Sequence, residues 1–108
     1  SPTLPFIEEL KRLGIDVKLH DPHYNNVDID QIAGVSTFQF PDGLTEFDAV
    51  VAVVDHSGYR ICQNQLLPLL RDCRVIIDNM GVWQNIDFDC ANSGIEYHIA
   101  GDANWLGS

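Results

Sequence analysis

The sequence predicts an α/β fold in which helices flank a parallel β-sheet. Two aliphatic runs, residues 49–54 and 75–77, are typical of strands buried on both faces. A leucine-rich helical segment around Leu66 separates them, and buried strands that alternate with helices favour a parallel sheet. The length of 108 residues, of which 45% are hydrophobic, fits a single domain over residues 1–108.

A helix is expected at the start of the chain. Ser1 is a suitable N-cap and Pro2 suits the first helical position. Four apolar residues then share one helical stripe, namely Phe6, Ile7, Leu10 and Leu13. Gly14 is expected to end the helix.

A strand is expected to follow at once, because the apolar residues Ile15, Val17 and Leu19 alternate with polar ones. Asp21 and Pro22 end it. Residues 24–47 carry weaker signals. Ile29 and Ile32 fit a short helix, and Phe38 and Phe40 could alternate in a short strand.

The second half of the chain has the clearer pattern. Residues 49–54 predict a strand that a turn ends at residues 55–58, and a helix follows around Leu66, with Pro68 inside it. Residues 74–78 predict a second buried strand, and residues 96–99 an edge strand.

The composition is strongly acidic. Sixteen acidic and six basic side chains give a net charge of −10, which indicates simple solubility or, as the sharper alternative, a high-salt host. It counts against binding of nucleic acid or an anionic membrane, because phosphate contacts need Lys and Arg. No run approaches the roughly 20 apolar residues that span a bilayer, and no signal peptide is visible. Three cysteines, Cys62, Cys73 and Cys90, are expected to be reduced thiols of a cytoplasmic protein.

Common catalytic and cofactor motifs are absent. No two of the eight glycines are two residues apart, so the dinucleotide fingerprint G-x-G-x-x-G is missing, as are the phosphate loop and the G-x-S-x-G elbow. Residues 20–23 (His-Asp-Pro-His) lack the further ligands that zinc needs. Cys62 beside His56 or His98 lacks the electropositive surroundings of a reactive thiol. We expect no metal site and no catalytic residue in this chain.

Polar residues follow each predicted strand. Asp21 ends the first, Asp55 and His56 follow the second, and Asp78 and Asn79 close the third. Ligands of open parallel sheets bind outside these carboxyl ends. The same residue types also satisfy the backbone of turns, so both interpretations stay open.

Three blocks carry a family resemblance: residues 1–22, from Ser-Pro-Thr-Leu to Asp-Pro; residues 47–59, with Asp-His-Ser; and residues 75–83, ending in Gly-Val-Trp. They resemble the C-terminal, UDP-binding domain of the UDP-glucose/GDP-mannose dehydrogenase family. Asp-His-Ser and Gly-Val-Trp look most like its UDP-N-acetyl-D-mannosamine dehydrogenase branch. The resemblance spans residues 1–83, with 24–46 poorly aligned, and implies a Rossmann-like fold.

The resemblance implies an NAD-dependent oxidoreductase. Enzymes of this family oxidise the C6 alcohol of a nucleotide sugar to a carboxylate with two NAD⁺, and other domains supply the NAD site and the catalytic cysteine. The C-terminal domain closes over the nucleotide end of the substrate. We expect the chain to be this domain of a larger dehydrogenase of polysaccharide biosynthesis. It would bind UDP-N-acetylmannosamine or UDP-glucose, and would be inactive alone because the parent enzyme binds NAD elsewhere.

The chain departs from the family's pattern in three respects. None of its cysteines lies in the family's Gly-rich catalytic motif, so that role is not transferred. The family's domain opens with a strand and a Lys-bearing loop before the Ser-Pro helix, so the predicted sheet lacks its first, central strand. Met80 stands where the family often has Arg or Lys, which removes a candidate phosphate contact. The net charge would then repel a diphosphate unless Arg60, Arg71 or Arg74 is aimed at the site.

The expected substrate-binding residues are His56, Ser57 and Tyr59 on one strand-end loop and Asn79 and Met80 on the next. They would orient the substrate and close over it. The exposed sheet edge left by the absent strand predicts a homo-oligomer. The alternative is a free-standing α/β ligand-binding or interaction module without catalytic activity, whose gene would carry neither G-x-G-x-x-G nor a Gly-rich cysteine motif upstream.

Overall fold

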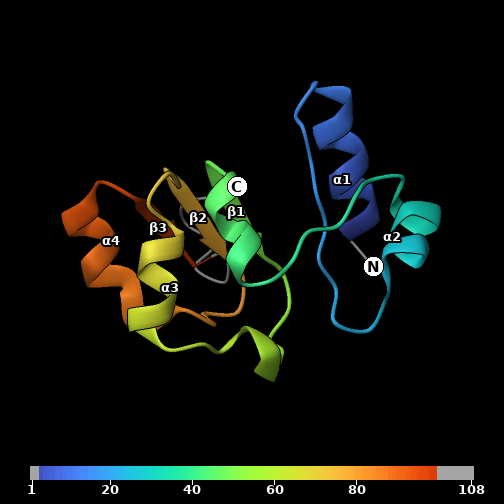
Figure 1. Ribbon diagram of the computed structural model, residues 1–108. Coiled ribbons are helices and arrows are strands. Elements are labelled where there is room, and N and C mark those ends of the chain that lie inside the picture. The colour runs from blue at the N-terminus through green and yellow to red at the C-terminus, as the bar shows by residue number, and fades with distance from the viewer. Residues whose placement is uncertain (1–2, 100–108) are drawn as a thin grey trace. The chain divides into compact units, whose positions relative to one another are not determined.

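The computed structural model describes residues 3–99, except for the side chain of Phe88. The chain divides into two compact units, Ser1–Phe40 (unit 1) and Pro41–Ser108 (unit 2). Unit 1 contains two helices and unit 2 contains the sheet (Figure 1). The N-cap predicted at Ser1 lies outside the described residues.

Unit 1 is built on helices α1 (Thr3–Arg12) and α2 (Asn26–Ala33). Both predicted helices are confirmed. Gly14, at φ +80°, follows the first helix as expected, and a reciprocal capping box between Asn25 and Asp28 starts the second. The buried cluster of unit 1 consists of Ile7, Ile29, Ala33 and Val35. The apolar stripe of α1 is only partly used, because Phe6 is 42% and Leu13 58% exposed.

The strand predicted over residues 15–19 is wrong. A single parallel bridge joins Lys18 to Ser36, and Leu19 N–H donates to the Ser36 carbonyl at 3.0 Å. Val17 and Leu19 still pack against the buried cluster. The alternation therefore indicated two of the three inward side chains correctly, since Ile15 is 49% exposed. Within the described residues, the segment forms a β-bridge at Lys18 only.

The short strand predicted at Phe38 and Phe40 is also wrong. Both rings contact His20, with ring centroids 5.6 Å and 5.5 Å apart respectively. Aromatic packing around one imidazole thus explains the spacing of the two phenylalanines, which sequence alternation could not distinguish from a strand.

Unit 2 contains a three-stranded parallel sheet in the order β1-β2-β3 (Figure 1). Its strands are β1 (Ala49–Ala52), β2 (Val75–Asp78) and β3 (Glu96–His98). Helix α3 (Gln63–Leu69) connects the first two, and α4 (Asp87–Ser93) connects the last two. The part of the unit described up to residue 99 also has three 3₁₀ turns: η1 (Asp42–Glu46), η2 (Ser57–Tyr59) and η3 (Gln84–Ile86). The predicted α/β fold is confirmed and is compatible with a Rossmann-like domain.

The core of unit 2 lies between the sheet and its helices. Its fully buried side chains are Leu44, Leu66, Leu70, Ile76, Asp78, Ile86 and Cys90. Six are apolar or thiol side chains, as expected for a hydrophobic core. Asp78 is the exception, and its hydrogen bonds explain its burial below.

The expectation that residues 49–54 are buried on both faces is wrong. The strand stops at Ala52, and Val51 and Val54 are 38% and 51% exposed. β1 has one paired neighbour within the described sheet, whereas β2 has two. A continuous aliphatic run is typical of a strand with neighbours on both sides, and here only β2 meets that condition, with Ile76 fully buried.

Helix α4 has no counterpart in the sequence-based expectations. Its residues include two Asp, one Asn and one Ser, which are weak helix formers. The helix ends at Gly94 in the left-handed conformation, at φ +77°. Burial of Cys90, rather than intrinsic propensity, accounts for this short helix.

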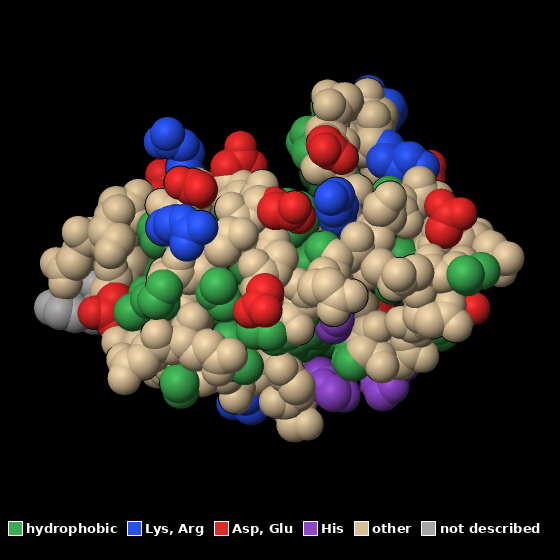
Figure 2. All heavy atoms as spheres, in the orientation of Figure 1, with side chains coloured by type: hydrophobic (Ala, Val, Ile, Leu, Met, Phe, Trp, Pro, Cys, Tyr) green, Lys and Arg blue, Asp and Glu red, His purple; other side chains and the backbone are tan. Residues whose placement is uncertain are grey.

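Unit 2 has many more acidic than basic side chains. Residues 41–108 carry ten acidic and three basic side chains. On the face drawn in Figure 2, acidic and basic side chains lie among one another, and the described residues form no broad basic patch there. Any anion bound by this unit therefore depends on a few individual donors.

Candidate functional site

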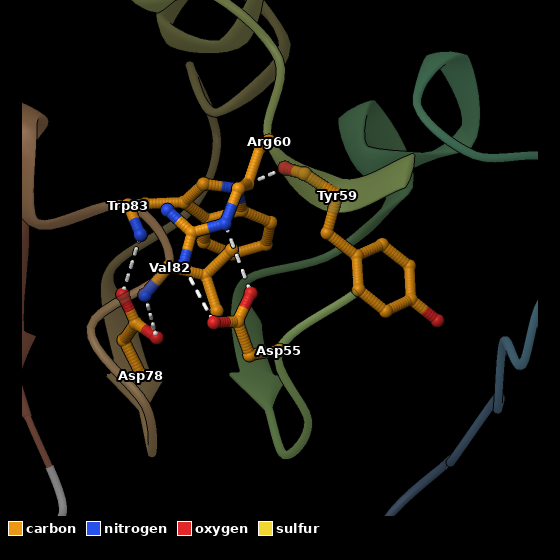
Figure 3. A network of polar contacts seen from close by, with 6 residues as sticks. All are labelled: Asp55, Tyr59, Arg60, Asp78, Val82 and Trp83. Atoms are coloured by element: carbon orange, nitrogen blue, oxygen red, sulfur yellow. Dashed lines mark hydrogen bonds and ion pairs between the residues drawn. The ribbon is translucent and has the colours of Figure 1, made fainter. Parts of the chain in front are cut away.

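The candidate site consists of two loops that follow the carboxyl ends of neighbouring parallel strands. We name them the β1–α3 loop, residues 53–62, and the β2 loop, residues 79–83. Asn79 Nδ2 donates to the Val53 carbonyl at 3.0 Å. Trp83 Nε1 donates to the Tyr59 carbonyl at 2.7 Å. These two bonds join the loops into one polar edge of the sheet, and Figure 3 shows the second of them.

The β2 loop is held by the buried carboxylate of Asp78, whose residue is 0% exposed. Its Oδ1 accepts from Val82 N–H at 2.9 Å and its Oδ2 from Trp83 N–H at 2.7 Å (Figure 3). The Tyr97 hydroxyl also donates to Oδ2. Burial and this bond to Asp78 raise the pKa of Tyr97. The carboxylate thus has three donors that compensate its charge.

The turn from Asp78 back to its two backbone donors depends on Gly81. Its φ of +70° lies in the left-handed region, which costs an L side chain about 1–2 kcal/mol. Val82 and Trp83 follow directly and point their N–H groups at the carboxylate (Figure 3). The sequence Asp-Asn-Met-Gly-Val-Trp therefore folds back on its own first side chain.

The β1–α3 loop has its own local order. His56 caps the η2 turn, since its Nδ1 accepts from Gly58 N–H at 2.9 Å. The neutral ring consequently carries its proton on Nε2. The His56 and Tyr59 rings meet edge to face, with centroids 5.9 Å apart. Figure 3 shows the Tyr59 ring directed away from Asp78 and Trp83.

A bidentate ion pair closes the same loop. Arg60 Nε donates to Asp55 Oδ1 at 2.9 Å, and Nη2 donates to Oδ2 at 2.6 Å. The Arg60 side chain is 53% exposed and that of Asp55 is 39% exposed. The hydrogen bond with Arg60 lowers the pKa of Asp55, and the bond with Asp55 raises the pKa of Arg60. This pair faces water, unlike the carboxylate of Asp78.

All five residues predicted to bind substrate lie on these two loops, which the structure brings together. His56 and Tyr59 are half-buried, Ser57 and Asn79 are exposed, and Met80 is 57% exposed. Their role in binding stays a prediction.

Asp21, expected on the same edge, follows no strand. It lies in unit 1, where its Oδ1 accepts from His23 N–H at 2.9 Å. This bond satisfies a turn, which is the simpler of the two roles considered for it.

Two features of the site were not expected from the sequence: the central place of Asp78 and the pairing of Asp55 with Arg60. A signal for the first was present. Residues alternate in burial along β2, which puts Asp78 on the same face as buried Ile76. No comparable periodicity marks the ion pair, because it closes within an irregular loop.

Metal-binding and thiol chemistry receive little support. Within residues 3–99, no group of three or more His, Cys, Asp or Glu side chains is placed to hold a metal ion. Cys73 and Cys90 are buried, and burial raises the pKa of Cys90 to about 11. Cys62 is exposed. In the same part of the chain, no helix is both long and apolar enough to cross a membrane.

Residues 1–85 match the UDP binding domain of the UDP-glucose/GDP-mannose dehydrogenase family. The chain belongs to this family. The matched residues include both loops of the candidate site and the whole Asp78 turn. Membership implies a parent dehydrogenase, that is, an oxidoreductase, and the resemblance seen in the sequence is confirmed at family level. No individual curated protein and no solved structure matches the chain significantly.

Proposed function

We propose that this chain binds the UDP part of a UDP-sugar in an NAD-dependent 6-dehydrogenase, at the edge formed by the β1–α3 and β2 loops. The observation that carries the proposal is the pair of bonds joining these loops, from Asn79 to Val53 and from Trp83 to Tyr59. They create one continuous polar edge where parallel sheets bind ligands. Both loops fall within the matched UDP binding domain.

The side chains on this edge are suited to hold and orient a nucleotide. His56 presents Nε2–H as a donor, because its Nδ1 already accepts from Gly58. Ser57 and Asn79 are exposed and polar, and Tyr59 and Met80 add apolar surface for a base or ribose. Loop closure over the substrate would exclude water and fix its orientation. The chemistry itself is assigned to other residues of the parent enzyme.

NAD is not placed on this chain, because its residues do not fit a dinucleotide site. The G-x-G-x-x-G turn, which brings a helix N-terminus to a pyrophosphate, is missing from the sequence. In this proposal NAD and the catalytic cysteine belong to other regions of a cytoplasmic enzyme of polysaccharide biosynthesis. Its product would be the uronate of UDP-N-acetylmannosamine or UDP-glucose.

We propose in addition that the protein is a homo-oligomer. Within the described sheet β1 pairs with β2 alone, and Ala49 and Val51 are exposed along it. An exposed apolar strand with a free edge favours pairing with another chain. Light scattering of the complete protein at high concentration should give a multiple of the monomer mass, and a clean monomer would rule this out.

Isothermal titration of UDP into the complete protein tests the site. Replacing His56→Ala should weaken UDP binding about tenfold, the effect of losing a hydrogen bond to a charged group. Asn92→Ala is a truncation at an exposed position of α4, close to the amino end of β3, and should leave affinity unchanged. Unchanged affinity in His56→Ala would sink the assignment of the β1–α3 loop.

A further inference from the structure

Unit 2 has three cations, and their positions relative to the sheet differ. Arg74 directly precedes β2, and its N–H donates to the Asp48 carbonyl just before β1. Arg71 lies in the turn after α3, where Nη1 donates to the Pro68 carbonyl at 3.3 Å. Both therefore belong to connections that enter the amino end of the sheet.

Arg60 is the one cation of residues 41–99 that lies at the carboxyl end of the sheet. It follows the η2 turn of the β1–α3 loop, and its N–H donates to the Ser57 carbonyl at 3.1 Å. The hydrogen bond with Asp55 is the main cause of the raised pKa of Arg60, and the charge of Asp78, the last residue of β2, adds to it. The guanidinium is thus within electrostatic reach of both strand ends.

The partner of Arg60 can be exchanged at little cost. Its pair with Asp55 is geometrically complete but exposed, and exposed ion pairs contribute little because water solvates both charges well when they separate. A diphosphate offers the planar guanidinium of Arg60 a more highly charged acceptor than the carboxylate of Asp55 does. Asp78 does not compete for it, since that carboxylate is occupied by Val82, Trp83 and Tyr97.

We propose that Arg60 is the ligand of the diphosphate group of a nucleoside diphosphate at this edge, and that Asp55 is its exchangeable counterion in the unliganded protein. The proposal rests on the UDP-binding role proposed above and identifies the group that recognises the negative charge. On binding, the guanidinium leaves Asp55 for the phosphate oxygens, and Asp55 is released to water. Asp55 therefore competes with the ligand.

Titration of the complete protein with UDP and with uridine tests this exchange. Arg60→Gln should weaken UDP binding about tenfold or more, because a charge-assisted bond is lost, and should leave uridine binding unchanged. Arg60→Lys should have a UDP affinity between those of the wild-type protein and Arg60→Gln, since it keeps the positive charge but loses the planar guanidinium that can donate two parallel hydrogen bonds. Asp55→Asn should strengthen UDP binding severalfold by removing the competitor. Arg71→Gln, which removes the same charge at the other end of the sheet, should change neither affinity.

The possible failures are distinguishable. A wild-type protein that binds no UDP overturns both this inference and the proposed function. A wild-type protein that binds UDP, with Arg60→Gln within twofold of it, overturns the role of Arg60 and leaves the site standing. Weaker binding by Asp55→Asn overturns the exchange, because Asp55 would then be orienting Arg60 instead of competing for it. Circular dichroism of each variant checks that it folds, and we expect native spectra because the exposed pair of Asp55 and Arg60 is not needed for folding.

Discussion

Asp55 and Asp78 lie at the carboxyl ends of neighbouring strands of one sheet, yet their carboxylates are held in opposite ways. Asp78 is fully buried and accepts from two backbone N–H groups and the Tyr97 hydroxyl. Asp55 is exposed and accepts two hydrogen bonds from the exposed side chain of Arg60. A buried, fully bonded carboxylate fixes a loop, whereas an exposed pair can change partners. The comparison separates the scaffold of the site from the part available to a ligand.

The largest difference between Asp78 and Asp55 should appear in protein stability when each side chain is truncated to alanine. Asp78→Ala leaves buried donors without an acceptor and should lower the free energy of unfolding by about 3 kcal/mol. Asp55→Ala should lower it far less, because the pair with Arg60 is exposed and water solvates both charges when they separate. Urea denaturation of both variants measures the difference. Equal losses would show that Asp78 is not the anchor of the β2 loop.

The two loops should also differ in how much stability is lost when a glycine in each is replaced by alanine. Gly81→Ala places a side chain at φ +70° and should cost about 1–2 kcal/mol of stability. Gly58→Ala serves as the control in the β1–α3 loop, where the added Cβ meets only the His56 ring, at 3.0 Å, and the strain is not in the backbone. Thermal unfolding should rank Gly81→Ala as the more destabilising. The reverse order would argue against the left-handed turn at Gly81.

Alkaline pH should weaken the Asp78 network selectively. The pKa of Tyr97 is raised in the folded protein, so the unfolded chain loses this proton first, from about pH 10. Stability conferred by the neutral phenol is therefore present below pH 10 and is lost above it, by up to about 1.4 kcal/mol per pH unit. Urea denaturation between pH 9 and 11 measures the slope.

Tyr97→Phe is the control for this slope, because the pKa of Cys90 is also raised, to about 11, and contributes over the same range. The variant should retain only the part of the slope that does not come from Tyr97. An identical slope in the variant and the wild-type protein would exclude a role for the Tyr97–Asp78 bond.

The smallest effect is expected at Met80, which is 57% exposed on the β2 loop. Met80→Lys adds a second cation to this edge, where Arg60 is the one Lys or Arg that residues 41–99 contribute, and should raise UDP affinity about three- to fivefold, as an exposed ion pair allows. Stability should not change. Met80→Gln removes the apolar side chain without adding charge, so it separates the effect of the new charge from the loss of apolar surface, and it should bind UDP no more tightly than the wild-type protein does. Equal affinities of the two variants would place the diphosphate away from Met80.

The sequence was most informative where local rules and tertiary packing agree. Ile76 and its neighbours predicted β2 correctly, and the turn residues after each strand located both loops of the site. Sequence-based prediction failed where the neighbouring segment of backbone decides whether a strand forms or is buried. Residues 15–19 alternate like a strand but have a neighbour at Lys18 only, and β1 is aliphatic but has one paired side in the described sheet.

The energetics of the site were the least predictable part. Alternation along β2 places Asp78 on the same face as Ile76, but the donors that converge on Asp78 and the exposure of Asp55 are not visible in either residue's immediate sequence. Helix α4 is similar, since packing of Cys90 stabilises a segment whose own propensity is weak. Pattern alone therefore located the edge of the sheet, while the distinction between its fixed and its exchangeable carboxylate needed the three-dimensional structure.

Backbone amide hydrogen exchange of the complete protein, with and without saturating UDP, tests most directly whether the two joined loops bind the nucleotide. UDP should slow exchange in residues 55–60 and 79–83 together, because the bonds from Asn79 and Trp83 make them one surface. Residues 71–74, at the opposite end of the sheet, should exchange at an unchanged rate. Protection that appears elsewhere in the protein while both loops exchange as before would contradict the proposed site.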